Sequence, residues 1–394
     1  MAVLVLVSAS GAQGASTVAV CGSGFGHGVG MSQYGAKGRA EAGQGYAQIV
    51  RAYYSGATLA TFPNNPQVRV LLSEKGTAES HDVTIRAGRT GQMENLATGG
   101  TLALPAGIYR TQYLPAMGLY RVTNVSTGAA LGSFRGPVLF RPVSGGPLGV
   151  GASDYRGTIT PRVVGTRFYL VNRLGMEAYL RGVVPQEMPS SWAPAALRSQ
   201  AIAARSYARA TQRTGAFDFY ADVRDQVYGG ASAETAATNA AVADTARVHA
   251  LHNGAVIRAL FHSSDGGHTE DAGRVFDFSA PYLRGFSDVD ALGRSFEGAA
   301  HGNSPWRRWS GTLDSGGSPQ FGVGEIQGVR VLERTPSGRV NTIEVRGSTG
   351  TRLVSGQQNI RFGLQSTGIL RVDGSTRPGG ALPSARISFG TACG

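Results

Sequence analysis

Lysine is almost absent from this chain of 394 residues, since Lys37 and Lys75 are the only two. Neither is followed by serine or threonine, which excludes the phosphate-binding loop of the P-loop nucleotide-binding proteins. Neither has a serine three residues before it, which excludes the acyl enzymes with a Ser-x-x-Lys motif. No histidine is followed by glutamate, so a His-Glu-x-x-His zinc protease is excluded as well.

Charge and long apolar runs are also scarce. Only 16% of the residues are charged while 58 are glycine, which disfavours long helices and favours turns and short strands. No run of about 18 apolar residues is present, so we expect no stable membrane span. The net charge of +12 is nearly all arginine, scattered singly along the chain. Nucleic-acid binding usually shows a clustered basic stripe, so the sequence indicates no nucleic acid and favours an anionic polymer such as a cell wall.

There are only two cysteines, Cys21 and Cys393, and no Cys-x-x-Cys pair that would indicate a zinc ribbon or a thioredoxin motif. They are either unpaired and buried, or joined in a disulfide, which requires an oxidising compartment. Residues 1–16 place an apolar stretch before small residues, as a secretory signal does, but without its basic start. This segment is either a truncated signal, which predicts a secreted or wall-located protein, or an ordinary buried strand.

The remaining chain predicts an α+β fold. Apolar and polar residues alternate in short runs separated by glycine, proline and asparagine over 66–145, which predicts a small all-β unit. That unit is either a wall-binding module or an inserted structural domain. The other predicted segments are a glycine-rich block at 17–60, a linker at 146–154, a mixed-sheet core with two alanine-rich helices at 150–373, and a tail at 374–394 that contains Cys393.

Three local signals help to place the core. Pro194 at a first helical turn predicts that an alanine-rich helix begins there. Ser232 is a favourable N-cap for a second such helix, which we expect to end near Ala246. Asn253-Gly254 between apolar segments predicts a β-hairpin with a type I′ turn.

Glu187 is the carboxyl group that stands out. It lies between Pro185 and Pro189, and each proline restricts its own φ and disfavours helical geometry in the preceding residue. We therefore expect Glu187 on a rigid non-helical turn just before the helix. Beside Met188 and Trp192, an apolar pocket would keep its carboxyl protonated for general acid catalysis. The alternative is an exposed loop glutamate, or one that caps the helix.

Two glycine-rich segments carry further candidates. Glycines alternate from Gly22 to Gly30, which either leaves one face of an extended strand bare for a flat polymer or allows tight packing of the backbone. His262 follows the predicted hairpin and is either a sugar-binding group or a satisfied core histidine. With His268 it supplies too few ligands for a complete zinc site, so no metal is expected.

Three motifs in this chain resemble the SpoIID/LytB family of sporulation stage II protein D-like wall proteins. They are EAYLRGVVPQEMPSSWAPAALRSQAIAARSYA at 177–208, FHSSDGGHTED at 261–271, and GFGHGVGMSQYGAKGRAEAGQGYAQIVRAYYSGATL at 24–59. The resemblance covers 17–60 and about 150–373 but not the β unit at 66–145. The glycine-histidine-glycine block precedes the core here, whereas in better-known members it follows it, so the resemblance implies a permuted chain.

The resemblance implies a peptidoglycan lytic transglycosylase. Such an enzyme cleaves the β-1,4 bond between N-acetylmuramic acid and N-acetylglucosamine, on glycan strands stripped of peptide, and leaves 1,6-anhydro ends. A hydrolytic glycosidase usually needs two carboxyls, whereas one glutamate, here Glu187, can serve an intramolecular attack. Asp265, Glu270 and Asp271 remain possible second carboxyls. The alternative function is a non-catalytic, wall-binding amidase enhancer, with an amidase as partner.

The resemblance also implies roles for other residues. Arg205 would bind the lactyl carboxylate of muramic acid, or else lie on the helix surface. The other residues expected to bind substrate are His262, Ser263, Ser264, His27, Gln33 and Tyr34. No cofactor is expected, because no ligand set matches that of the zinc-binding members. If the chain is permuted, its ends meet and a disulfide joins Cys21 to Cys393.

Overall fold

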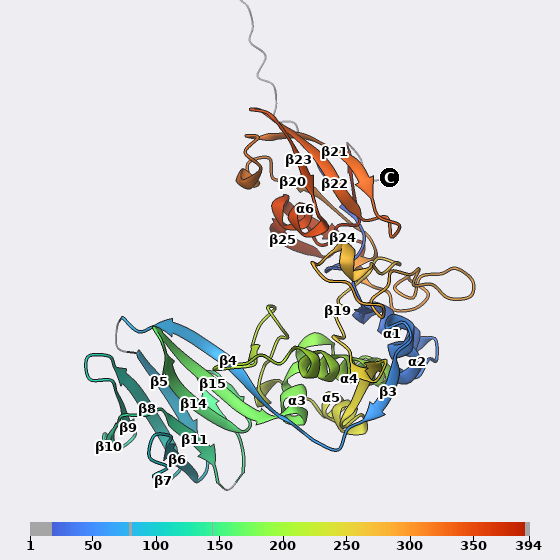
Figure 1. Ribbon diagram of the computed structural model, residues 1–394. Coiled ribbons are helices and arrows are strands. Elements are labelled where there is room, and N and C mark those ends of the chain that lie inside the picture. The colour runs from blue at the N-terminus through green and yellow to red at the C-terminus, as the bar shows by residue number, and fades with distance from the viewer. Residues whose placement is uncertain (1–17, 79–80, 144, 391–394) are drawn as a thin grey trace, which may run out of the picture. The chain divides into compact units, whose positions relative to one another are not determined.

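The computed structural model describes residues 18–78, 81–143 and 145–390. It divides into two compact units (Figure 1). Unit 1 combines the described residues up to Gly38 with those from Phe261 onward, and unit 2 comprises Arg39–Leu260. Both units contain helices and sheets, which confirms the α+β class. Within the described residues, no helix is both long enough and apolar enough to cross a membrane.

Unit 2 contains two β-sheets that share one apolar core. The seven-stranded sheet has the order β16-β4-β15-β14-β11-β6-β7 and the six-stranded sheet the order β10-β9-β8-β5-β12-β13. Apolar side chains from both sheets, including Ile85, Tyr109, Phe140 and Leu170, are buried between them. The strands are β4 (Gln67–Gly76), β5 (His81–Ala87), β6 (Gly91–Asn95), β7 (Thr101–Leu104), β8 (Gly107–Leu114), β9 (Leu119–Asn124), β10 (Ala130–Phe134), β11 (Val138–Pro142), β12 (Leu148–Val150), β13 (Ser153–Tyr155), β14 (Thr158–Val164), β15 (Arg167–Gly175) and β16 (Phe219–Tyr220).

These sheets extend past residue 145. The segment 146–154, which the sequence indicates as a linker, instead contains β12 and the start of β13, whose Leu148 side chain is buried in the shared core. β15 pairs with β4 along its whole length, from Arg167 opposite Gly76 to Gly175 opposite Gln67. Strands of the predicted β unit therefore share a sheet with strands of the predicted core.

The helices of unit 2 pack around α4. They are α2 (Tyr46–Tyr53), α3 (Met176–Glu187), α4 (Pro194–Thr211) and α5 (Ala236–Asp244), with a 3-10 turn η1 (Ala231–Ala233) before α5. Helix α4 contacts the other three, and its alanine-rich face is fully buried because small side chains let the helices approach closely. Pro194 is its first residue, as predicted. The second alanine-rich helix is present as α5, but the predicted N-cap was wrong, because the cap is Thr235 and not Ser232; the Thr235 hydroxyl accepts from the amide of Thr238.

A small three-stranded sheet completes unit 2. It consists of β3 (Thr58–Thr61), β17 (Val248–His252) and β18 (Ala255–Val256) in the order β18-β17-β3. Asn253 and Gly254 join β17 to β18 with φ values of 50° and 80°. The predicted hairpin is therefore confirmed, since a type I′ turn needs two positive φ values.

Unit 1 is built from a five-stranded sheet, β25-β24-β20-β1-β26, and a three-stranded sheet, β21-β22-β23, which share a core with Trp309, Ile343 and Ile369. The N-terminal β1 lies between β20 and β26, so residues from both ends of the chain form one sheet. The elements are β1 (Ala19–Gly22), β2 (Met31–Ser32), α1 (Gln33–Glu41, which runs to the start of unit 2), β19 (Phe261–His262), η2 (Ala272–Arg274), η3 (Pro305–Arg307), β20 (Trp309–Leu313), η4 (Pro319–Phe321), β21 (Ile326–Arg334), β22 (Val340–Gly347), β23 (Thr351–Ser355), α6 (Gln357–Gly363), β24 (Gln365–Arg371), β25 (Thr376–Ala381) and β26 (Ile387–Gly390).

The glycine run of unit 1 is not the extended strand with a bare face that the alternation predicted. Gly24, Gly26, Gly28 and Gly30 have φ values between +74° and +112°, a region that side chains other than glycine rarely adopt. A Cβ atom at Gly24 would lie 2.9 Å from the carbonyl oxygen of Ser264. The glycines allow close packing of the backbone, which is the alternative that the sequence left open.

Candidate active site

Glu187 is the last residue of α3 and not part of a separate turn, so this prediction was wrong. Pro185 lies inside the helix, in its last turn, where it removes one hydrogen bond of the helix, and the helix ends within two residues. Pro189 acts as expected: it disfavours helical geometry in Met188, which has φ −131° and ψ 138°. The helix thus stops at Glu187 and leaves its side chain half-buried at the helix end.

The Glu187 carboxylate is oriented by a backbone amide. The N–H of Val227 donates to its Oε1 at 3.1 Å. Val227 lies in the loop 225–230, which packs against the same helix, since the amide of Gly229 donates to the carbonyl of Gly182 at 3.0 Å. A carboxyl held at a helix end by a fixed donor has a defined direction, as a general acid requires.

Two hydrogen bonds between buried side chains hold this loop in place. The hydroxyl of Tyr179 donates to Oε1 of Gln226 at 3.2 Å, and the hydroxyl of Tyr228 donates to Oδ1 of Asn172 at 2.8 Å. Burial raises the pKa of Tyr179 well above its ordinary value, and the charges of neighbouring groups, Glu187 among them, raise it further. Tyr179 therefore stays a neutral donor beneath the site.

Asp225 anchors the beginning of the same loop. Its buried carboxylate accepts two hydrogen bonds from the guanidinium of Arg213, at 2.6 and 2.8 Å. It also accepts from the amide of Tyr220 at 2.8 Å and the hydroxyl of Tyr207 at 3.3 Å. Because donors surround it on several sides, the Asp225 carboxylate stabilises the loop. Glu187 is then the half-buried carboxyl that remains at the helix end.

Arg205 lies in a different place from the one predicted. Its side chain is fully buried within unit 2, and its guanidinium donates to both carboxylate oxygens of Glu177, at 2.9 and 2.7 Å. It also donates to the backbone carbonyls of Val248 and Val242. A guanidinium enclosed in this way has no face for a substrate carboxylate, because α4 presents it to α3 and α5 and not to solvent.

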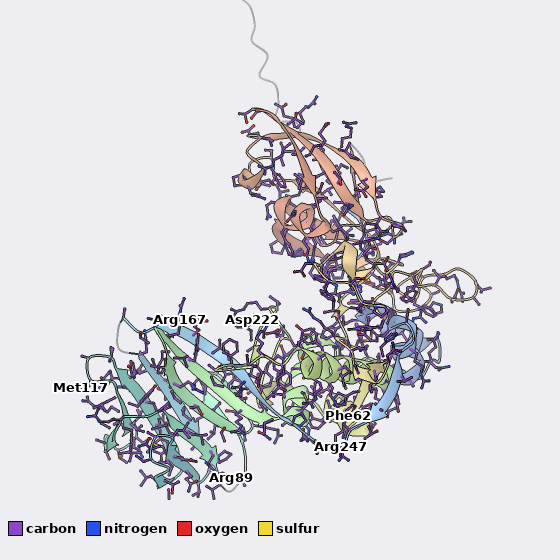
Figure 2. All side chains as sticks on the ribbon, viewed as in Figure 1. Phe62, Arg89, Met117, Arg167, Asp222 and Arg247 are labelled. Carbon is purple, nitrogen blue, oxygen red and sulfur yellow. The ribbon has the colours of Figure 1, made fainter. Side chains whose placement is uncertain are left out.

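The Glu177 carboxylate also accepts a hydrogen bond from the backbone amide of Arg247, at 3.0 Å. Arg247 has a φ of 63°, and its carbonyl accepts from the amide of Phe62, beside which it lies in Figure 2. One carboxylate at the start of α3 therefore ties α4 to the turn before β17. The sequence analysis missed Glu177, although it begins the first family-like motif.

The remaining predicted site residues lie together in unit 1, and three of them, His262, Ser264 and Gln33, are buried. His262 and Ser264 are 5% and 1% exposed. His262 does not extend the hairpin: β18 ends at Val256, and β19 pairs in parallel with β2 instead. The ring of His262 contacts that of His27 at 5.3 Å, and burial lowers its pKa well below the ordinary value. His262 is thus buried and neutral, with Nδ1 3.2 Å from the carbonyl oxygen of Val29, but its Nε2 has no hydrogen-bond partner among the described residues. It is therefore not a fully satisfied core histidine, and its role in binding substrate stays a prediction.

Glu297 organises the polar interior around these residues. The hydroxyls of Ser32 and Ser264 donate to its carboxylate, as do the amides of Asp265 and Gly266 at 2.6 and 3.0 Å. This fully buried carboxylate joins the second and third family-like motifs to each other. The sequence carried no local signal for Glu297, because its four donors come from segments 31 to 265 residues away.

His27, Ser263, Gln33 and Tyr34 are placed at the edge of this interior. His27 is half-buried, its Nδ1 accepts from the amide of Val29, and burial together with the charge of Arg361 lowers its pKa to about 3. Gln33 and Tyr34 are the first two residues of α1, and the Tyr34 amide donates to the carbonyl of Ser263. Gln33 is 7% exposed, whereas Tyr34 is half-buried. Their role in binding substrate stays a prediction.

The structure therefore collects the site residues into two groups. Glu187 and Arg205 belong to unit 2, and the histidine, serine, glutamine and tyrosine candidates belong to unit 1. Across the described ranges, no group of three or more His, Cys, Asp or Glu side chains is arranged to hold a metal ion. Cys21 lies in β1 opposite Ser388 of β26, but Cys393 lies outside the described residues, so the disulfide stays a prediction.

Comparison with known proteins gives a consistent relationship. Residues 165–252, which include Glu187 and its loop, match the family model SpoIID, described as stage II sporulation protein. Stage II sporulation protein D of Bacillus subtilis is 30% identical over 181 residues, which cover 41% of this chain and 51% of that protein. The amidase enhancer of Bacillus subtilis is 43% identical over 104 residues, which cover 26% of this chain and 14% of that protein.

An uncharacterized protein of Brachyspira hyodysenteriae is 35% identical over 136 residues, which cover 34% of this chain and 37% of that protein. The chain thus spans about half or less of the length of these relatives. The shared region is that of sporulation- and amidase-related proteins. These matches confirm the resemblance of the chain's motifs to the SpoIID/LytB family.

Proposed function

We propose that this protein is a secreted lytic transglycosylase of peptidoglycan and that Glu187 is its catalytic acid and base. One observation carries the proposal: a half-buried carboxyl at the end of α3, oriented by the Val227 amide, lies inside the segment shared with the family. The relatives named for sporulation and for amidase enhancement support a role at the cell wall.

In this reaction a single carboxyl, that of Glu187, first donates a proton and then accepts one. Protonated Glu187 gives its proton to the glycosidic oxygen, the bond from that oxygen to C1 of muramic acid breaks, and N-acetylglucosamine leaves as an alcohol. The 6-hydroxyl of the same muramic acid attacks C1 and loses its proton to the Glu187 carboxylate. The 1,6-anhydro ring closes, the acid is restored, and no water is consumed.

The state of the other candidate carboxyls supports a single-carboxyl mechanism. Asp265 is fully buried, and burial next to Glu297 raises its pKa well above the ordinary value. Glu270 is 1% exposed and accepts hydrogen bonds from Thr335 and Ser337. A hydrolytic glycosidase needs a second carboxyl at the substrate, and neither of these two is accessible for that role. Asp271 is the one partly exposed member of the set that the sequence left open.

The proposal extends to the chain's organisation and substrate. The described part of the glycine-rich block before Arg39 belongs to the same unit as the residues from Phe261 onward, which supports a permuted order of the family's segments. The strands between β4 and β15 would be an insertion that binds wall or spaces the units. The substrate would be glycan already stripped of its peptides.

A second function, a non-catalytic amidase enhancer that binds the wall and an amidase, is favoured by the relative of that name. The two functions differ in what they require of Glu187. An enhancer tolerates its replacement, because binding needs no transferable proton at this position, whereas a transglycosylase does not.

The experiment that separates them is digestion of purified peptidoglycan, with the products read by mass. Glu187→Gln keeps the shape of the side chain and should lower the rate of glycan cleavage by roughly 10²–10⁴ or more. The matched control is Glu74→Gln, which removes a surface carboxylate that pairs with Arg167 at 3.3 Å, and it should cleave normally. Cleavage in ¹⁸O water should leave muramic acid ends without label. Full activity of the Glu187→Gln protein, or labelled ends, would contradict the assignment.

A further inference from the structure

A cavity of about 760 Å³ opens on the five-stranded sheet of unit 1. Its lining includes four arginines, Arg308, Arg334, Arg371 and Arg386, from β20, β21, β24 and β26 or the residues next to them. Among the described residues that line it, none is an aspartate or a glutamate. Four guanidinium groups that converge without a lining carboxylate give this cavity a strongly positive potential.

These guanidinium groups are only partly satisfied by the protein itself: Arg334 donates to the carbonyl of Gly338 at 2.9 Å and Arg371 to that of Thr376 at 3.5 Å. None of the four forms an ion pair with a carboxylate in the described part of the chain. Nη1 of Arg386 and Nε of Arg371 are buried without a hydrogen-bond partner. Burial and the charge of Arg386 lower the pKa of Arg334, which means that the two cations repel each other. An anion bound between Arg334 and Arg386 would pair with both cations and remove the repulsion.

The floor of the cavity is formed by residues that face one another across neighbouring strands. Trp309 of β20 lies opposite Arg371 of β24 on one side and opposite Gly22 of β1 on the other. The indole covers Gly22 so closely that a Cβ atom there would lie 2.4 Å from its Cζ2 atom. Beside this floor, Leu370 and Val372 are 49% and 41% exposed and add an apolar side.

We propose that this cavity is a binding site for an oligoanion, a ligand with at least two phosphate or carboxylate groups on a body with an apolar side. Arginine forks match both kinds of group bidentately, and the volume lies in the range of about 300–1,000 Å³ of small-ligand sites. In a wall protein the ligand is a segment of an anionic wall polymer. That identification rests on the proposed function, whereas the binding of anions does not.

The test is isothermal titration of the full chain, with Glu187→Gln present so that no turnover occurs. Two probes distinguish the sources of the anion: tripolyphosphate for phosphate and tetraglutamate for carboxylate. At least one should bind saturably and more weakly as salt is raised. Arg386→Gln and Arg334→Gln should each weaken binding by about tenfold or more, the effect of one charge-assisted hydrogen bond. The control Arg346→Gln removes an exposed arginine of β22 and should leave affinity unchanged.

A thermal melt of the same variants separates binding from a structural role. Because Nη1 of Arg386 has no hydrogen-bond partner among the described residues and Arg386 repels Arg334, Arg386→Gln should melt at the same or a higher temperature than the parent while it loses affinity. A lower melting temperature, equal affinity for the Arg346→Gln and Arg386→Gln proteins, or no saturable binding of either probe would overturn the proposal. Tighter binding of a single-stranded oligonucleotide through these arginines would overturn the identification of the ligand as a segment of a wall polymer. Normal glycan cleavage by the wild type in any of these cases would leave the proposed function standing.

Discussion

Arg205 of α4 donates to both oxygens of Glu177 at the start of α3, at 2.9 and 2.7 Å, and its side chain is fully buried. A bidentate pair of this kind holds two helices at a fixed distance and angle. Since Glu187 ends α3, the pair positions the catalytic candidate from the opposite end of its helix. Its contribution is to architecture and not to contact with substrate.

The first prediction concerns this pair. Arg205→Met removes the cation and leaves the Glu177 carboxylate partly buried without its partner, so the free energy of unfolding should fall by about 3–5 kcal/mol. Chemical denaturation measures this loss. The control Arg198→Met removes an arginine that pairs with Asp244 at the surface and should cost about 1 kcal/mol or less. Unchanged stability of Arg205→Met with a raised KM for glycan would restore the predicted role in binding substrate.

The second prediction concerns Gly28. It has a φ of +82°, and a Cβ atom there would lie 2.4 Å from Nη2 of the buried Arg339. Gly28→Ala should therefore destabilise unit 1 by more than about 1 kcal/mol. Gly374 has a φ of +81° with nothing near its Cβ position, so Gly374→Ala carries the backbone strain alone. Equal losses of stability in the two variants would show that the contact with Arg339 is not needed.

The third prediction is a pH dependence due to His249. Burial lowers the pKa of His249 from 6.5 to about 4, Arg205 opposes its protonation, and nearby Glu177 favours it. Between these two values the unfolded chain binds a proton that the folded chain does not. Stability should therefore fall as the pH drops from about 6.5 to 4, by at most about 1.4 kcal/mol per pH unit from this group.

The variant His249→Gln tests the source of that slope. Its amide can still donate to the carbonyl of Arg247, as Nδ1 of the neutral histidine does at 2.9 Å, but it does not titrate. Unfolding free energies measured from pH 7 to pH 4 should fall less steeply for this variant than for the wild type. Parallel curves would assign the pH dependence to other groups.

The fourth prediction is the disulfide between Cys21 and Cys393. Cys21 of β1 lies opposite Ser388 of β26. Ser388 lies five residues before Cys393 in the sequence. Thiol titration of the denatured, unreduced protein isolated from outside the cell should find no free thiol. Cys21→Ser should lower the stability by about 4–5 kcal/mol in the chain-entropy model for a loop of this size. Two titratable thiols would rule the bond out.

Local patterns in the sequence determined several features of this protein. Asn253-Gly254 specified a two-residue hairpin because both residues accept positive φ values at low cost. Pro194 marked the first residue of α4 because a missing N–H costs nothing there. The three motifs identified the family, and with it Glu187 as the residue to test. Each of these conclusions depends on a residue and its near neighbours in the chain.

The tertiary structure decided what those neighbours could not. Pro185 stays inside α3, although local rules place it in a turn. Arg205 is an interior cation because Glu177, 28 residues earlier, lies beside it, and Glu297 gathers donors from as far as Ser32. Burial, ion pairing and close approach are properties of groups that meet only when the chain has folded. The sequence determined which groups were available, and the packing of distant segments decided which of them face substrate and which hold the fold together.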